Sequence, residues 1–253
     1  MKTFIDRLLR NSITFEITAI FVYMFYCIVF AVSMFPSFIL IRWGTDLLND
    51  TYLMLFVFAT ICTLSLYMFL IVSTVVVGTI ERLLTIGIKP GSYSPGSVTF
   101  FRWLTYSGLH LWFVIIVLTF LRGTNWIKIY MRIAGAKVGR ETFINAKDIY
   151  DTYLIELGNE VMIGGDAFLN CHLYENGFLN LRKIIIEDGA TIGAHSYLTP
   201  GTRIGKNATV GMCTYLRRNT TVRDGETLMT PPGMGRRQVI RMMRHKGKEE
   251  QKV

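Results

Sequence analysis

IEDGAT-IGAHSY-LTPGTR-IGKNAT-VGMCTY-LRRNTT-VRDGET, residues 186–227, is a succession of six-residue repeats. Each repeat begins with an aliphatic residue, and alanine, serine or threonine stands four positions later in all but the last. A period of six fits neither an α-helix nor the two-residue alternation of a strand. It is typical of a parallel β-helix, in which one hexad forms one flat side and three hexads complete a triangular coil. Each coil needs its neighbours to bury the aliphatic residues inside the prism.

The same rhythm extends upstream with less regularity. Hexads begin at Val138, Ile144, Leu157, Ile163 and Leu169. The next aliphatic position comes seventeen residues after the last of these, one short of three hexads. The segment HLYENGFLNLRK within this interval is therefore predicted to be an irregular coil or a loop that leaves the prism. Segments that interrupt a repeat usually carry the binding chemistry of a solenoid. The pattern predicts a β-helix domain over residues 122–230.

The first half of the chain, residues 1–121, is predicted to be a membrane domain. The stretches at about 17–41 and 52–80 contain no charged residue. Both exceed the roughly 20 residues that cross a bilayer core, and together they predict a membrane α-helical hairpin. A third apolar segment, 104–121, contains Ser107, Gly108 and His110, so it is either a third span or a re-entrant or interfacial helix.

The positive charges predict how these segments are oriented. Basic residues flank the first span, lie in the loop before the third segment and dominate the C-terminal half. The positive-inside tendency then places both ends in the cytoplasm and favours two crossings, with a third span as the alternative. Residues 125–136 are predicted to form a short amphipathic helix at the membrane surface, and 1–11 and the basic tail 231–253 to rest on lipid. The expected location is a multi-pass protein of the cell membrane with a cytoplasmic β-helix.

The composition limits the partners. The net charge is +9, and 20 of the 27 basic residues but only 13 of the 18 acidic ones lie from Arg122 onward. A basic face beside lipid favours membrane lipid headgroups, and secondly an acidic or phosphorylated partner. Nucleic acid is a poor third, because no groove-reading motif accompanies the charge. The four cysteines form no CxxC pair, so disulfides and a zinc or other metal site are not expected.

The hexads IGAHSYLTPGTRIG resemble the hexapeptide-repeat, or left-handed parallel β-helix, acyltransferase superfamily over roughly 138–227. A narrower resemblance rests on KPGSYSP, FFRWL, GTNWIKIYMRIAGAKVG and CHLYENGFLNLRKIII. These segments are similar to the membrane-anchored C-terminal domains of polylysine-synthetase-type nonribosomal peptide synthetases. The resemblance implies an acyl-CoA or a phosphopantetheinyl carrier protein as co-substrate, no bound cofactor, and a homotrimer with sites between neighbouring prisms. The sequence contains no adenylation or carrier domain, so an activated acyl group would come from another protein or a free thioester.

Acyl transfer from a thioester needs a base for the incoming amine or hydroxyl and hydrogen-bond donors for the oxyanion. Histidine is the natural base. His172 lies where the hexad rhythm breaks and matches the histidine of the resembling insert, so we predict it as the catalytic base. Glu175 could orient its imidazole or bind a substrate amine. Asn170 and Tyr174 flank His172 and could donate to an oxyanion.

Other polar residues are weaker candidates. Asp148 and Asp151 come in the irregular turn NAKDIYDTYL and could line the same cleft or cap the turn. His195 falls at an outward corner of a regular hexad, where it is either solvated or part of a site between subunits. Arg217 and Arg218 could bind the phosphate of the donor or form a solvated basic face. The two other histidines, at 110 and 245, are expected to be a polar group satisfied within helices and a solvated tail residue.

These features predict a membrane-bound acyltransferase. It would move an acyl or aminoacyl group from a CoA or carrier-protein thioester to an acceptor amine or hydroxyl at the cytoplasmic membrane surface, with His172 as general base. The alternative is a non-catalytic trimeric scaffold at the membrane that recruits pathway enzymes or carrier proteins.

Overall fold

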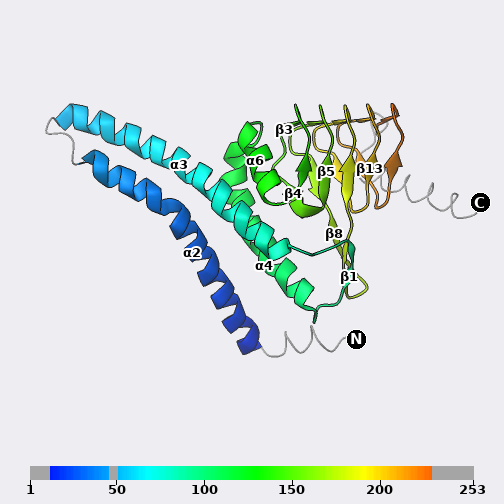
Figure 1. The fold of residues 1–253 in the computed structure, drawn as a ribbon, viewed down its shortest axis with the longest axis horizontal. Coiled ribbons are helices and arrows are strands. Elements are labelled where there is room, and N and C mark those ends of the chain that lie inside the picture. The colour runs from blue at the N-terminus through cyan, green and yellow to red at the C-terminus, as the bar shows by residue number, and fades with distance from the viewer. Residues whose placement is uncertain (1–11, 46–50, 230–253) are drawn as a thin grey trace, which may run out of the picture.

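Two long helices lead into a β-helix in the computed structural model, which describes residues 12–45 and 51–229 (Figure 1). Helices α2 (Ser12–Thr45) and α3 (Thr51–Thr85) lie side by side as an antiparallel pair. The most apolar stretches of these helices have a mean hydropathy of 2.2 and 2.4. Both helices are long enough to cross a membrane. The predicted helical hairpin is present. The segments 1–11 and 231–253, predicted to rest on lipid, lie outside the described residues.

A third apolar helical segment runs from Val98 to Leu121. It consists of α4 (Val98–Phe113), a π-helical turn η1 (Val114–Leu118) and the short α5 (Thr119–Leu121). Its mean hydropathy of 1.9 and its 24 residues also suffice to cross a membrane, by length and composition. However, 44% of its most apolar 18-residue stretch is buried within the protein, against 22% and 11% of the corresponding stretches of the first two helices. This segment packs against α3 and the β-helix, and two crossings stay a prediction.

Helix α6 (Asn125–Ile133) joins the helical part to the first coil. Thr124 caps its first turn by accepting a hydrogen bond from Trp126 N, as a cap threonine commonly does. The apolar side of the helix is buried and packs on α3, through Ile127, Tyr130 and Met131. The predicted amphipathic helix is thus present, but its apolar side packs on protein. On its basic side, Arg132 donates to the carbonyl oxygens of the first coil at residues 138 and 139.

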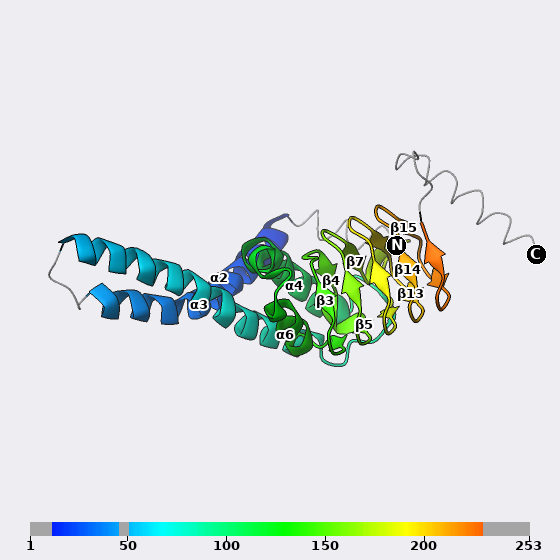
Figure 2. The ribbon, with the colours of Figure 1, turned by 90° about the horizontal axis from the view of Figure 1, so that it is seen from above.

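The strands of the second half stack in three parallel sheets that form the sides of a prism (Figure 2). This arrangement confirms the predicted parallel β-helix. The first sheet contains β2 (Lys137–Val138), β5 (Ile155–Leu157), β10 (Ile184–Ile186), β13 (Arg203–Ile204) and β16 (Thr221–Val222). The second contains β3 (Phe143–Ile144), β6 (Met162–Ile163), β11 (Thr191–Ile192), β14 (Thr209–Val210) and β17 (Thr227–Leu228). The third contains β4 (Ile149–Tyr150), β7 (Phe168–Asn170), β12 (Tyr197–Leu198) and β15 (Tyr215–Leu216).

The hexad explains each position of the coil. The aliphatic residues pair in register from coil to coil, as Ile186 does with Ile204, and they are buried. In the regular hexads from Ile186 onward, the third residue after the aliphatic one turns the corner with a positive φ, as His195 and Asn207 do at 55°. At Gly193, a Cβ would lie 2.5 Å from the Met212 nitrogen of the next coil, so only glycine permits this stacking distance.

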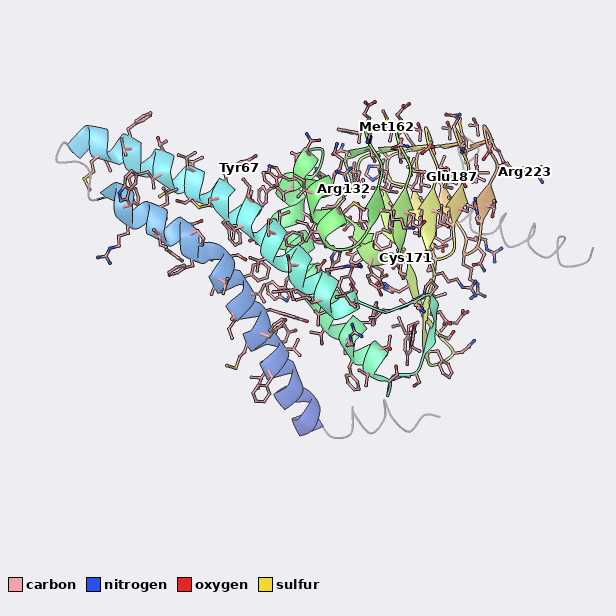
Figure 3. The ribbon with its side chains drawn as sticks, in the orientation of Figure 1. Tyr67, Arg132, Met162, Cys171, Glu187 and Arg223 are labelled. Atoms are coloured by element: carbon pink, nitrogen blue, oxygen red, sulfur yellow. The ribbon has the colours of Figure 1, made fainter. Side chains whose placement is uncertain are left out.

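The interrupted coil contains a hairpin that leaves the prism. Strands β8 (His172–Glu175) and β9 (Phe178–Leu181) form an antiparallel pair, and β1 (Gly91–Tyr93) adds a third strand from the loop between α3 and α4. Of the two alternatives for this segment, an irregular coil or an excursion, the structure has the excursion. Figure 3 shows Cys171 at the point where the hairpin leaves the prism. Burial of this cysteine raises the pKa of its thiol well above the ordinary value.

Candidate active site

A pocket of about 330 Å³ lies between helix α4 and the third sheet of the prism. The helix contributes residues spaced so that they share one face, and the prism contributes residues from the ends of β4, β7 and β8. The lining residues are Leu104, Ser107, Gly108 and Leu111 from the helix, and Tyr150, Phe168, Asn170 and His172 from the prism. The pocket is mostly apolar, and its polar groups gather on the prism side, as is common in small-molecule sites.

A histidine–carboxylate pair stands at the polar side of this pocket. His172 Nδ1 lies 2.6 Å from Asp151 Oδ2. The imidazole side chain is 24% exposed, whereas the carboxylate is 1% exposed. Asp151 occupies the left-handed region, with φ 58° and ψ 50°, at the start of the short 3₁₀ turn η2 (Thr152–Leu154). Aspartate tolerates this conformation better than most residues, and here it directs the carboxylate inward, beneath the imidazole.

The second oxygen of this carboxylate is held by the helical part of the molecule. Trp103, on α4, donates its indole N–H to Asp151 Oδ1 at 2.8 Å. The indole also meets the edge of the His172 ring, with a centroid distance of 5.0 Å. Both carboxylate oxygens therefore have a donor, one from each half of the chain. The pair is complete only when α4 is docked on the prism.

This geometry selects one tautomer of the imidazole. A carboxylate accepts hydrogen bonds, so the proton of a neutral His172 lies on Nδ1 and points at Asp151. Nε2 is then the nitrogen with a free lone pair for a proton from a molecule in the pocket. A histidine oriented in this way by a buried carboxylate has the arrangement required of a general base.

Two neighbouring groups could donate to a developing oxyanion. Asn170 accepts a hydrogen bond from His172 N through Oδ1, at 3.2 Å, which leaves its amide N–H₂ as a donor. Tyr150 lines the pocket from the strand before Asp151. Burial, and secondly the charge of Asp148, raise the pKa of its phenol, so the phenol keeps its proton and remains a donor.

The hairpin residues after His172 lie elsewhere. Glu175, expected to orient the imidazole or to bind an amine, forms an ion pair with Arg218, and Asp151 occupies the place beside the imidazole. Tyr174 is 44% exposed and packs its ring near Phe100 of α4, at a centroid distance of 6.4 Å. The structure therefore brings together His172, Asp151 and Asn170 at the pocket, without Glu175 or Tyr174 among its lining residues.

The remaining candidates lie on the surface of the coils. Asp148 is partly buried, and its backbone oxygen accepts from Leu169 N. His195 is an exposed corner residue. Arg217 and Arg218 are exposed and follow β15, the last strand of its sheet among the described residues, where no described strand stacks over them.

A second histidine–carboxylate pair is sealed inside the helical part. His110 Nδ1 lies 3.1 Å from Glu81 Oε1 and 2.9 Å from the hydroxyl of Tyr130, which donates to Glu81 Oε2 at 2.5 Å. The side chains of His110 and Glu81 are both fully buried. As expected from the sequence, neighbouring helices supply polar partners to this histidine, here α3 and α6, although they reach only Nδ1 and its buried Nε2 has no hydrogen-bond partner among the described residues.

Sequence reasoning did not find the contribution of α4. Trp103 and the four pocket residues of that helix gave no separate signal, because they resemble any apolar helix face. The one available signal was their spacing, with two leucines seven residues apart and a small pair between them. Within the described residues, no three histidine, cysteine, aspartate or glutamate side chains gather as metal ligands do.

Comparisons with known proteins find the repeat and two partial relatives. Residues 183–218 match the family model described as "Bacterial transferase hexapeptide (six repeats)". The chain is 29% identical over 170 residues to delta-poly-L-ornithine synthetase of Acinetobacter baumannii (strain AB307-0294). That match covers 67% of this chain but 12% of the synthetase.

The other similarities are also partial. The Bacillus subtilis (strain 168) protein YvoF, whose name places it with acetyltransferases, is 28% identical over 103 residues, or 40% of this chain and 59% of YvoF. The crystal structure of a maltose O-acetyltransferase from Clostridium difficile 630 is 16% identical, with a TM-score of 0.44. It covers 61% of this chain and 93% of that enzyme.

Proposed function

Since this chain carries the hexapeptide repeats of bacterial transferases, we propose that it is an acyltransferase that works at a membrane surface. It moves an acyl or aminoacyl group from a CoA or carrier-protein thioester to the amine or hydroxyl of an acceptor. The observation that carries the proposal is the His172–Asp151 pair at the edge of a pocket. A scaffold has no use for a histidine held in one tautomer beside an open cavity.

The reaction follows from the order of the groups. His172 Nε2 takes the proton of the acceptor amine or hydroxyl as that group attacks the thioester carbonyl. The carboxylate of Asp151, hydrogen-bonded to Nδ1, stabilises the imidazolium. The oxyanion of the tetrahedral intermediate accepts hydrogen bonds from the Asn170 amide and the Tyr150 phenol. When the C–S bond breaks, His172 returns the proton to the leaving thiolate, so the base is regenerated.

The donor is expected to approach from the prism. Arg218 lies beside the hairpin through its ion pair with Glu175, and β8 spans only residues 172–175. At about 3.3 Å per residue, His172 and the arginine end of this strand are roughly 10 Å apart. A phosphate of a CoA or pantetheinyl donor could replace Glu175 on Arg218, with Arg217 as a second contact. We also propose the homotrimer implied by the resemblance.

The membrane location is supported by the helices. Three segments are long and apolar enough to cross a bilayer, and their exposed side chains include large apolar residues such as Phe21, Phe56 and Phe120. Exposed apolar surface of this extent needs a lipid or protein cover. The cytoplasmic orientation of the β-helix follows from the charge distribution.

A transfer assay tests the proposal. The full chain in phosphatidylcholine vesicles receives acyl-CoA thioesters with a radiolabelled acyl group and a panel of amines and alcohols. We expect His172→Ala to lower kcat by roughly 10²–10⁴-fold, as loss of a general base does. His245→Ala, in the basic C-terminal stretch of the sequence, serves as the matched control. A folded His172→Ala variant with full activity would remove the histidine from the mechanism. Absence of transfer from every thioester would favour the scaffold.

A further inference from the structure

Helix α4 presents one continuous apolar face to the pocket. Leu104, Gly108 and Leu111 are spaced by four and three residues, which places them on the same side of the helix. Ser107 and Gly108 lie between the two leucines, and the Tyr26 hydroxyl occupies the space that a Cβ at Gly108 would take. Both leucines are nearly half exposed, 47% and 48%, although each borders the cavity. An aliphatic groove is therefore open to an incoming chain.

An exposed apolar side chain lies beyond the pocket, in the π-helical turn η1 that follows α4. Ile115 follows Leu111 by four residues and is 60% exposed. This stretch belongs to a segment with the length and composition of a membrane span. Exposed apolar side chains therefore lie both at the pocket beside His172 and, through Ile115, in the part of the molecule expected to meet lipid.

The wall of the groove is fixed by its neighbours. Tyr26, on α2, donates its hydroxyl to the Thr105 carbonyl at 2.9 Å, and a Cβ at Gly108 would lie 2.3 Å from that hydroxyl oxygen. Trp103 attaches the same helix to Asp151. The helix face is therefore held at a set position relative to the imidazole. A ligand with a polar end at His172 would lay its apolar part along this face.

We propose that this groove binds an aliphatic chain of the acceptor, so that the acceptor is an amphiphile that enters from the lipid side. This inference rests on the proposed function. The pocket volume, near the lower limit for small-molecule sites, suffices for the reacting end and the first carbons, and the chain continues along α4. The acceptor is favoured over the donor as the occupant of the groove. The groove lies on the apolar helix, whereas the arginines proposed to bind the donor lie on the prism.

The probes are primary n-alkylamines from butyl to dodecyl, given with labelled acyl-CoA to the full chain in phosphatidylcholine vesicles. Each methylene that enters an apolar groove should raise kcat/KM by about threefold to fourfold until the groove is full. Leu111→Gln keeps the size of the side chain but makes the groove polar. We expect it to lower kcat/KM about tenfold for dodecylamine and less than threefold for butylamine. Leu83→Gln, at an exposed leucine on α3 outside the pocket, is the control.

The control separates binding in the groove from partition into the vesicle, because partition is the same for both variants. Equal chain-length dependence in Leu111→Gln, Leu83→Gln and wild type would overturn the groove while the acyltransferase stands. A loss that follows the length of the acyl donor, tested with octanoyl-CoA against acetyl-CoA, would assign the chain to the donor and overturn the acceptor assignment. If neither these amines nor the n-alkanols of the same lengths are acylated, the proposed function fails and the inference with it.

A second measurement uses only the wild-type protein, so it tests the groove even if Leu111→Gln does not fold. An alkylamine with a diazirine near its end, photolysed on the wild-type protein, should label peptides that contain residues 104–115. Labelling confined to other helices would contradict the groove.

Discussion

The chain contains two histidine–carboxylate pairs, and they differ in what surrounds them. In the first, His110 and Glu81 are 3.1 Å apart and both side chains are fully buried between α3, α4 and α6. In the second, His172 and Asp151 are 2.6 Å apart, and the imidazole is 24% exposed beside a pocket. The residue chemistry is the same in both. Access decides that one pair joins helices and that the other is available to a substrate.

The comparison also shows how the two halves of the chain depend on each other. The sealed pair connects α3 with α4, and Tyr130 adds α6. The open pair is completed by Trp103, two turns before His110 on the same helix. Helix α4 therefore contributes to both pairs. Changes to the sealed pair should alter stability, and changes to the open pair should alter turnover.

The largest effect is expected from Asp151→Asn. Asparagine is tolerated at the positive φ of this position, so the turn should keep its shape. Its amide donates to Nδ1, which moves the imidazole proton to Nε2 and removes the lone pair that acts as base. We expect kcat to fall by roughly 10²–10⁴-fold, measured in the labelled-transfer assay.

Asp166→Asn is the control for this substitution. Asp166 also has a positive φ, 51°, but lies at the surface, where it pairs with Arg122. Its activity should stay within about twofold of wild type, because exposed ion pairs contribute little. An Asp151→Asn enzyme as active as this control would show that the open pair is not the base.

The next largest effect is on stability. Glu81→Leu leaves His110 and Tyr130 buried without their shared acceptor, which should cost about 3–5 kcal/mol of the free energy of unfolding. Glu81→Gln keeps an acceptor oxygen and should cost clearly less. Thermal unfolding of the detergent-solubilised protein measures both. Equal, small losses would mean that the sealed pair does not hold the helices together.

Trp103→Phe should have an intermediate effect on turnover. It removes the N–H that holds Asp151 Oδ1 while keeping an aromatic ring on α4. A hydrogen bond to a charged group contributes about 1.5–3 kcal/mol, so kcat should fall tenfold or more while KM for the donor stays the same. Trp112→Phe, on the exposed side of the same helix, is the control. A parallel rise in KM would point to a loosened pocket instead.

The smallest effect is expected from Glu175→Gln. Both side chains of its ion pair with Arg218 are well exposed, at 41% and 58%. Such pairs contribute less than about 1 kcal/mol, so the free energy of unfolding should change by no more than this. The value of kcat should change less than about threefold. A hundredfold loss of kcat would instead give Glu175 the catalytic role that its place near His172 suggested in the sequence.

The regular coils were predictable from sequence because each hexad position has one local requirement. An aliphatic residue must point inward, the third residue after it must turn the corner, and a small residue must fit beside it, as Ile192, His195 and Ser196 do. The same hexads carried the resemblance to hexapeptide-repeat acyltransferases, and residues 183–218 match the model described as "Bacterial transferase hexapeptide (six repeats)". The domain limits at 121 and 230 and the trimer stay predictions.

The candidate base was also visible in the sequence, as the histidine at the broken repeat. Its partner was predicted wrongly, because Glu175, three residues away, was expected to orient the imidazole, whereas Asp151, 21 residues away, was expected only to line the cleft or cap a turn. Separation along the chain does not report distance in space once a hairpin leaves the coil. The left-handed turn at Asp151 and the path of β8 decided which carboxylate meets the imidazole.

The sequence by itself determined the repeat, the apolar helices and the interruption, because periodicity and hydropathy are local properties. Only the tertiary structure decided that Trp103 meets Asp151 across 48 residues, that β1 extends the hairpin, and that α4 forms one wall of the pocket. These contacts depend on how a helix docks on a prism. Docking is set by the packing of whole surfaces, and many sequences with the same local pattern could satisfy it.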